Sequence, residues 1–336
     1  MTAPEVHHHD LVVLGASAGG VEALRDVVSG LPAGLPAAVL VVLHMPAHAD
    51  SALATILNRC GPLPVEPARH GAPLRPGRIQ VAVPDQHLLV KDTHTLLSRA
   101  PKQNRARPAV DALFRSAARW HGSRTVGAIL SGTLDDGAAG LAAIDAVGGA
   151  CLVQDPADAL FRAMPTAALT VVPQAITCPA ANMGEEIRRL VTERLPDPVA
   201  TPPDPDLITE TEMAENVPRT ASELPGHSVP ISCPDCTGGM NLVQTGAAVH
   251  YTCHIGHIWS PQTLIAAQQD KIEQALWTAV SMLEEQANIH DALALRAATA
   301  TGLGGLTQAH QHAAAREIRT AAGVIRKHFP EFMRQP

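Results

Sequence analysis

The sequence predicts an α/β protein with a doubly wound, mostly parallel sheet, followed by a small C-terminal module and a helical tail. Three observations support this fold class. Short runs of Val, Leu and Ile alternate with Ala-rich helical stretches before residue 196, as buried parallel strands and their crossover helices do. Three of the six cysteines cluster between residues 233 and 253. Farther along the chain, apolar residues recur at helical spacing.

The composition narrows the class of protein. Of the 336 residues, 46% are hydrophobic and only 2% are aromatic, so the core must be built from Ala, Val and Leu. The net charge of −7 argues against a general nucleic-acid binder, because phosphate contacts need a basic surface. We find no apolar run long enough to cross a bilayer and no secretory signal in Met1–Glu5. We therefore expect a cytoplasmic protein with no membrane insertion and no nucleic-acid partner.

The first strand runs from Asp10 into a glycine-rich turn, Gly15-Ala16-Ser17-Ala18-Gly19-Gly20, and a helix follows to Gly30. Glycines supply the backbone angles and the close approach that such a turn needs, which leaves the Ser17 side chain at its apex. Two interpretations are open for the turn alone. It fits the G-x-S-x-G nucleophile pattern. It also fits a phosphate-binding βα turn, although Ser17 stands where G-x-G-x-x-G has its middle glycine.

The other elements before residue 196 follow from apolar runs and their breaks. We expect buried strands at residues 37–43, 125–130 and 150–154, a strand pair formed by 78–83 and 87–91, and helices at 51–58, 107–122 and 137–149. Strands that alternate with helices imply a parallel, doubly wound sheet with right-handed crossovers.

Three polar side chains stand just past the carboxyl ends of predicted strands: Ser17, His44 and Asp136. That edge of an open α/β sheet holds the ligand crevice. A serine hydroxyl needs a base to take its proton, and an imidazole does this best when a carboxylate orients it. Taken singly, His44 could be a structural donor and Asp136 a helix cap, but their joint placement favours a catalytic triad. The chain order Ser, His, Asp differs from the Ser, Asp, His order of α/β-hydrolases.

Five separated blocks carry a resemblance to a known family. They are Gly15–Gly20, Val42–Pro46, Arg107–Phe114, Ser131–Gly140 and Ala163–Pro165. In this order they resemble the catalytic domain of CheB-type chemotaxis protein-glutamate methylesterases. The resemblance covers roughly residues 10–195, and five blocks in the family's order make chance agreement a poor explanation.

The resemblance implies a role for each site residue. Ser17 corresponds to the family's nucleophile, His44 to its general base and Asp136 to its orienting aspartate. The oxyanion donors would be the backbone amides of Ala18 and Thr133. Position 133 is Thr where the family frequently has Met, a change that a backbone donor tolerates.

The same resemblance implies hydrolysis of glutamate methyl esters on receptor coiled coils with release of methanol, and in many members deamidation of glutamine. The partner would be a methylated chemoreceptor-type protein. Because the catalytic turn begins near residue 10, we expect no receiver domain in cis, so a response regulator would be a separate partner. Two alternatives stay open: a non-catalytic signalling adaptor that binds a receptor or regulator, and hydrolysis of an unrelated small ester.

Residues 196–230 differ in composition from the segment before them. Proline and acidic residues dominate, with little periodicity. Such a segment cannot bury enough apolar surface to offset the entropy lost on ordering. We therefore expect a flexible linker here, between a catalytic domain at residues 10–195 and the C-terminal module.

Residues 231–260 are expected to form a zinc-ribbon-like module. Cys233-x₂-Cys236 and Cys253-x₃-His257 are separated by 16 residues, the spacing of a pair of zinc knuckles. Three sulfurs and one imidazole nitrogen would close a tetrahedral, structural zinc site. This zinc would have no catalytic role, and we expect no cofactor for catalysis. His254 competes with His257 as the fourth ligand, but it lies too close to Cys253 in the sequence for the loop of a zinc knuckle. The alternative is a metal-free hairpin with reduced cysteines.

Residues 261–333 are expected to form a helical tail. A first helix spans 261–300, Gly302–Gly305 breaks it, and a second spans 308–333. Apolar residues at helical spacing predict one buried stripe on the first helix: Leu264, Ile265, Ile272, Leu276, Val280 and Leu283. The two helices would pack as an intramolecular hairpin, or a dimer or partner coiled coil would cover the stripe instead.

Overall fold

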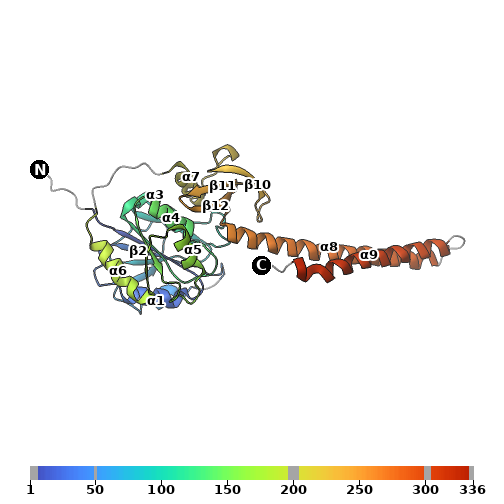
Figure 1. The fold of residues 1–336 in the computed structure, drawn as a ribbon, viewed down its shortest axis with the longest axis horizontal. Coiled ribbons are helices and arrows are strands. Elements are labelled where there is room, and N and C mark those ends of the chain that lie inside the picture. The colour runs from blue at the N-terminus through green and yellow to red at the C-terminus, as the bar shows by residue number, and fades with distance from the viewer. Residues whose placement is uncertain (1–6, 49–50, 196–203, 299–303, 333–336) are drawn as a thin grey trace. The chain divides into compact units, whose positions relative to one another are not determined.

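The computed structural model describes residues 7–48, 51–195, 204–298 and 304–332. These residues form two compact units, one ending at Leu264 and the other beginning at Ile265. Figure 1 shows both units as ribbons. We describe each unit by itself.

A seven-stranded sheet forms the centre of the first unit, in the order β3-β4-β2-β1-β7-β8-β9, and its pairings are parallel. Its strands are β1 Leu11–Ala16, β2 Ala38–Leu43, β3 Val65–Pro67, β4 Ile79–Val81, β7 Thr125–Ile129, β8 Ala150–Gln154 and β9 Ile176–Cys178. The chain builds outward from β1 through β2, then returns to add β7 on the other side of β1. The strand order therefore reverses beside β1, where open α/β sheets hold their ligands.

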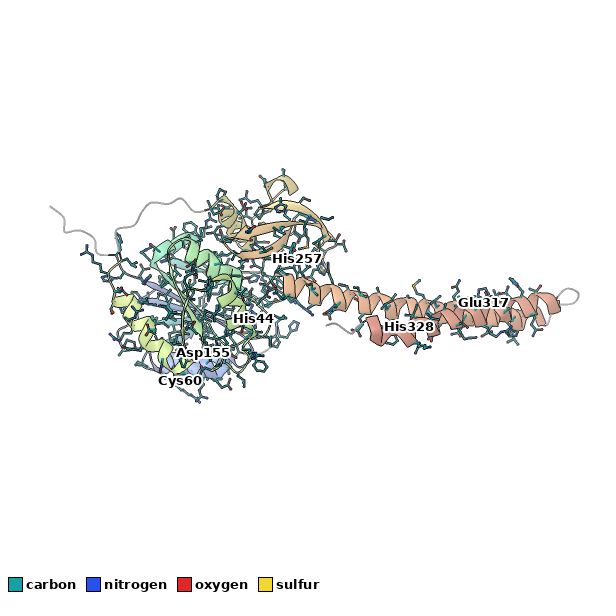
Figure 2. The ribbon with its side chains drawn as sticks, in the orientation of Figure 1. His44, Cys60, Asp155, His257, Glu317 and His328 are labelled. Carbon is teal, nitrogen blue, oxygen red and sulfur yellow. The ribbon has the colours of Figure 1, made fainter. Side chains whose placement is uncertain are left out.

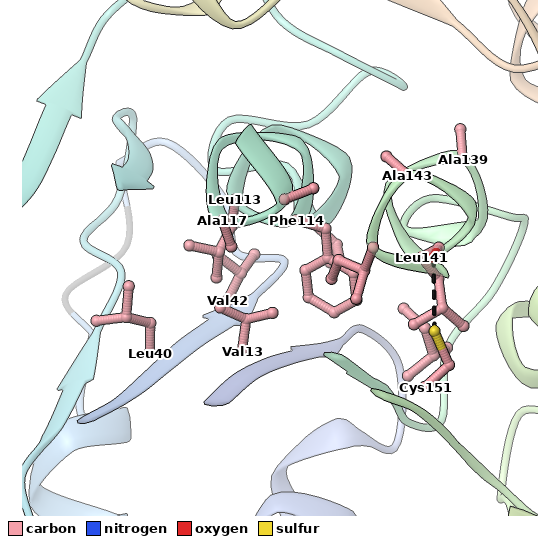
Figure 3. Close-up of a cluster of buried hydrophobic side chains, with 14 of the residues drawn as sticks. Val13, Leu40, Val42, Leu113, Phe114, Ala117, Ala139, Leu141, Ala143 and Cys151 are labelled. Atoms are coloured by element: carbon pink, nitrogen blue, oxygen red, sulfur yellow. Dashed lines mark hydrogen bonds between the residues drawn. The ribbon is translucent and has the colours of Figure 1, made fainter. Parts of the chain in front are cut away.

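Helices cover both faces of this sheet (Figure 1). They are α1 Gly20–Ser29, α2 Leu53–Leu57, α3 Val110–His121, α4 Ala138–Ala146, α5 Ala163–Val171 and α6 Ala180–Thr192. Side chains of β1 alternate between two cores: Val12 packs in the core with α1 and α6, and Val13 in the core with α3 and α4. Figure 3 shows the second core, with Phe114 lying between the strands and the helices. The predicted doubly wound, mostly parallel α/β fold is confirmed.

The predicted buried strands at 37–43, 125–130 and 150–154 are present. The predicted pairing of 78–83 with 87–91 is wrong. β4 instead pairs in parallel with β2 and β3, and β5 His87–Lys91 forms an antiparallel hairpin with β6 His94–Ser98. Asp92 takes a positive φ of 52° in the turn of that hairpin, a conformation that Asp tolerates better than most residues.

A four-stranded sheet in the order β10-β11-β12-β13 also belongs to the first unit. Its strands are β10 His227–Ser232, β11 Gly239–Thr245, β12 Ala248–Cys253 and β13 Ile258–Trp259. All of its pairings are antiparallel. It begins at His227, a few residues before the predicted module start at residue 231.

The predicted linker differs from the structure where it can be compared. Residues 196–203 lie outside the described residues, but α7 Pro205–Ala214 is a helix. Asp204 caps it by accepting a hydrogen bond from the Asp206 amide at 2.9 Å, a common helix start. Leu207 and Met213 are buried. The average composition of residues 196–230 does not reveal this local helix start. The expectation of a flexible linker is therefore wrong for α7.

The second unit contains a pair of helices. α8 spans Pro261–Ala298 and α9 spans Gly304–Phe332, so the first residues of α8 belong to the first unit. The rings of Trp277 and Phe329 lie 4.8 Å apart, and Arg326 binds Glu284 at 2.7 Å. α8 and α9 therefore pack as the predicted hairpin.

The buried stripe of α8 differs in part from the predicted one. Ile265 and Ile272 are about half exposed (51% and 52%), whereas Val280, Ala287 and Ala294 are buried at a spacing of seven residues. Small side chains allow two helices to approach closely. Gly302 lies outside the described residues, and Gly304 and Gly305 belong to α9. No helix among the described residues is long and apolar enough to cross a membrane.

Candidate active site

The turn between β1 and α1 carries Ser17. A Cβ on Gly15 would lie only 2.2 Å from Val110 Cγ1, so the backbone there packs directly against α3. Gly19 has a φ of +68°, a left-handed conformation that favours glycine. The Ser17 amide donates to the Ser131 carbonyl at 2.9 Å. These constraints hold Ser17 at the carboxyl edge of the sheet, beside the loop that follows β7.

The three predicted triad side chains meet at this edge. His44 Nδ1 lies 3.1 Å from Ser17 Oγ, and His44 Nε2 lies 2.6 Å from Asp136 Oδ2. His44 follows β2, and its amide donates to the Ala16 carbonyl at 3.1 Å. Figure 2 labels His44 within the body formed by the parallel sheet. The arrangement can pass a proton from a serine hydroxyl to an imidazole that a carboxylate orients.

Asp136 is buried, with 2% of its side chain exposed. Its carboxylate also accepts hydrogen bonds from the Val110 amide at 2.6 Å and from Asn104 Nδ2 at 2.8 Å. Burial alone would raise the pKa of Asp136, but the hydrogen bond and charge of His44, with the bonds from Asn104 and Val110, lower it to about 2. Asp136 is therefore an ionised acceptor at neutral pH.

A family model for the CheB methylesterase matches residues 12–187, more than half of the chain. The chain belongs to the CheB methylesterase family. It is 40% identical over 196 residues to a protein-glutamate methylesterase/protein-glutamine glutaminase of Nocardioides sp., covering 57% of this chain and 53% of the relative. It is 42% identical over 160 residues to a protein of the same name, numbered 2, from Anaeromyxobacter dehalogenans, covering 48% and 47%. The chain thus spans about half the length of these relatives.

A solved structure agrees with this CheB assignment. The crystal structure of the Thermotoga maritima CheB methylesterase catalytic domain superimposes with a TM-score of 0.52 and 32% sequence identity. The match covers 98% of that domain and 54% of this chain. The antiparallel sheet and the hairpin of α8 and α9 lie beyond the residues that the CheB family model matches.

Two further aspartates lie beside Ser17, His44 and Asp136. Burial, followed by the charge of Asp136, raises the pKa of Asp111 to about 7. Burial also raises the pKa of Asp135 to about 6, against the lowering effect of a hydrogen bond from Ser260. Sequence reasoning assigned no role to Asp111 or Asn104, because buried polar neighbours of a site have no periodic signature.

The predicted oxyanion donors are the amides of Ala18 and Thr133. A Cβ on Gly132 would lie 2.9 Å from Ser17 Cβ, so the loop that carries Thr133 passes against the Ser17 side chain. Within the described ranges, neither amide donates to another protein group. Their role in the CheB site stays a prediction.

A second cluster lies in the antiparallel sheet, outside the CheB match. Ligand atoms of Cys233, Cys236, Cys253 and His257 lie within 4.8 Å of one another. Cys236 Sγ is 3.6 Å from Cys253 Sγ, and Cys253 Sγ is 3.5 Å from His257 Nδ1. His254 is not in the group. Three thiols and one imidazole are the donor set of closed, tetrahedral zinc sites.

Proposed function

We propose that this chain is a protein-glutamate methylesterase. The observation that carries the proposal is the unbroken hydrogen-bond chain from Ser17 through His44 to Asp136. Asp136 accepts from His44 Nε2 and so keeps that nitrogen protonated. The lone pair of His44 Nδ1 then faces the Ser17 hydroxyl, ready to accept its proton.

The proposed reaction has two stages. Ser17 Oγ bonds to the ester carbonyl carbon while its proton passes to His44 Nδ1. The amides of Ala18 and Thr133 stabilise the oxyanion. The intermediate collapses, the carbon–methoxy bond breaks, and the proton on His44 leaves with methanol. Water, deprotonated by His44, then cleaves the glutamyl-Ser17 ester and restores the free serine. A glutamine side chain would react at the same carbonyl and release ammonia.

The proposed substrate is a methylated chemoreceptor-type protein in the cytoplasm, and a separate response regulator is a candidate partner. Exposed apolar side chains near Ser17 support a macromolecular substrate. Leu160 is 72% exposed and Phe161 is 41% exposed. The Phe161 carbonyl accepts the Gly132 amide at 2.9 Å, beside the nucleophile. Small-ester hydrolysis would not need this apolar rim.

The test is release of methanol from a receptor fragment that carries tritium-labelled methyl esters on glutamate. The full chain should release volatile tritium in a time- and enzyme-dependent way. A matched fragment labelled on lysine N-methyl groups should release none, since no ester is present. Binding of the receptor fragment without methanol release would contradict the esterase and favour the adaptor.

We also propose that Cys233, Cys236, Cys253 and His257 hold a structural zinc ion. Bound zinc would link the turn between β10 and β11 to the end of β12 and the turn before β13, stabilising a small sheet with a limited core. Metal analysis of the purified chain should find about one zinc per chain, and Cys253→Ser should lose most of it. Cys60→Ser is the control, because Cys60 lies outside the cluster and donates to the Ile56 carbonyl at 3.2 Å. Metal content unchanged in Cys253→Ser would refute the site.

A further inference from the structure

The Asn104 side chain joins the triad to a segment outside the family match. It is buried, with 4% of its surface exposed. Its Nδ2 donates to Asp136 Oδ1 and to Asp111 Oδ2, both at 2.8 Å. Its Oδ1 accepts from the Ser260 amide at 2.7 Å and from Thr263 Oγ1 at 3.2 Å. Both hydrogens of the Asn104 side-chain amide are therefore used, and Oδ1 has two donors within reach, of which the Ser260 amide is the nearer.

These partners fix which way the amide faces. A backbone N–H such as that of Ser260 can only donate, and an ionised carboxylate such as that of Asp136 can only accept. Rotating the amide by half a turn would bring Asn104 Oδ1 against the carboxylates and its NH₂ against the Ser260 amide. A buried polar group without a partner raises the free energy of the folded state. The donors to Oδ1 therefore favour the orientation in which Nδ2 faces Asp136.

The donors come from the chain that follows the antiparallel sheet. Ser260 follows β13 directly and caps α8, and Thr263 lies in the first turn of that helix. The backbone amide of Asn104 reinforces this contact, because it donates to the Ile258 carbonyl at 2.8 Å. Ser260 Oγ also donates to Asp135 Oδ1 at 2.5 Å. Thr263 is fully buried. Its one hydroxyl hydrogen lies within reach of Ser260 Oγ at 2.7 Å, the Ser260 carbonyl at 3.1 Å and Asn104 Oδ1 at 3.2 Å, so this hydroxyl ties Asn104 to Ser260.

We propose that Thr263 and Ser260 are positioning residues of the esterase, which act by orienting Asn104 so that it holds the Asp136 carboxylate in line with His44. The proposal rests on the proposed function. Asn104 occupies Asp136 Oδ1 and leaves Oδ2 to His44 and the Val110 amide. A carboxylate that rotates would take His44 with it and separate Nδ1 from Ser17.

The test compares Thr263→Val, which removes only the hydroxyl donor, with Thr263→Ser, which keeps it. Two rates are measured on the full chain: the kcat for methanol release, and the rate at which a fluorophosphonate labels Ser17, read by mass spectrometry. We expect Thr263→Val to lower both rates by about fivefold to tenfold, with KM unchanged, as loss of one buried hydrogen bond implies. Thr263→Ser should stay within about twofold of the parent, because it retains the donor.

Thr252→Val is the matched control. Thr252 is fully buried in β12, and its hydroxyl has no hydrogen-bond partner among the residues that the structure describes, so the same isosteric change should leave both rates unaltered. A stronger variant, Asn104→Asp, replaces the donor by a third carboxylate and should lower labelling by about 10²-fold. Parent-like rates in Thr263→Val or in Asn104→Asp would overturn the proposal. Labelling needs no receptor, so failure of the proposed function would appear separately, as a parent chain that labels at Ser17 and releases no methanol.

Discussion

Replacing Ser17 by alanine (Ser17→Ala) is expected to lower the kcat of methyl-ester hydrolysis by on the order of 10³-fold or more. The variant lacks the only atom that forms the covalent bond, while the βα turn keeps its geometry. His44→Ala should cost a similar factor, because an unassisted serine hydroxyl is a poor nucleophile. The measurement is steady-state methanol release from labelled receptor fragment.

The double variant with both changes should be little worse than either single variant, because triad members act as a unit. Ser29→Ala is the matched control: Ser29 is exposed at the end of α1, and its hydroxyl donates to the Asp26 carbonyl at 2.8 Å. Its kcat should equal that of the parent. Parent-like turnover in Ser17→Ala would remove the covalent mechanism.

Asp136→Asn is expected to lower kcat by about 10³- to 10⁴-fold. Every polar neighbour of the carboxylate donates: His44 Nε2, the Val110 amide, Asn104 Nδ2 and the Asp111 amide. An asparagine offers one oxygen and one NH₂ group, so a donor must face a donor. If the NH₂ faces His44, the imidazole carries its proton on Nδ1 and cannot accept one from Ser17.

The control for that change is Asp145→Asn. The Asp145 carboxylate accepts a hydrogen bond from Gln174 Nε2 at 2.8 Å. An asparagine oxygen can accept the same bond, so kcat should not change. Urea denaturation should show that both variants are folded under the conditions of the kinetic assay. A kcat within about tenfold of the parent for Asp136→Asn would contradict the assigned role of this carboxylate.

The parallel sheet and the meeting of Ser17, His44 and Asp136 at one sheet edge could be predicted from the sequence, because both have local signatures. Buried strands appear as unbroken apolar runs such as Ala38–Leu43, and strand ends identify the side chains that share one sheet edge. The predicted pairing of residues 78–83 with 87–91 was wrong for a physical reason. Sequence proximity favoured a hairpin, whereas β4 satisfies its backbone groups with β2 and β3.

The second layer of the site could not be predicted from the sequence. Asn104 meets Ser260 and Thr263 across more than 150 residues, and no spacing rule relates positions so far apart. Glu210 and His250 form a similar buried pair between α7 and β12. The charged residues of 196–230 looked like a solvated linker because the partner that buries Glu210 lies on another element.

The bonding of Asn104 Oδ1 has a practical consequence for the choice of fragment boundaries. A polypeptide trimmed to the residues that align with the family, 12–187, would keep Ser17, His44 and Asp136. It would lack Ser260 and Thr263, the two residues that donate to Asn104 Oδ1 and orient this side chain. The smallest autonomous hydrolase cut from this chain should therefore extend through the first turn of α8, and its length is dictated by two hydrogen bonds and not by the number of strands.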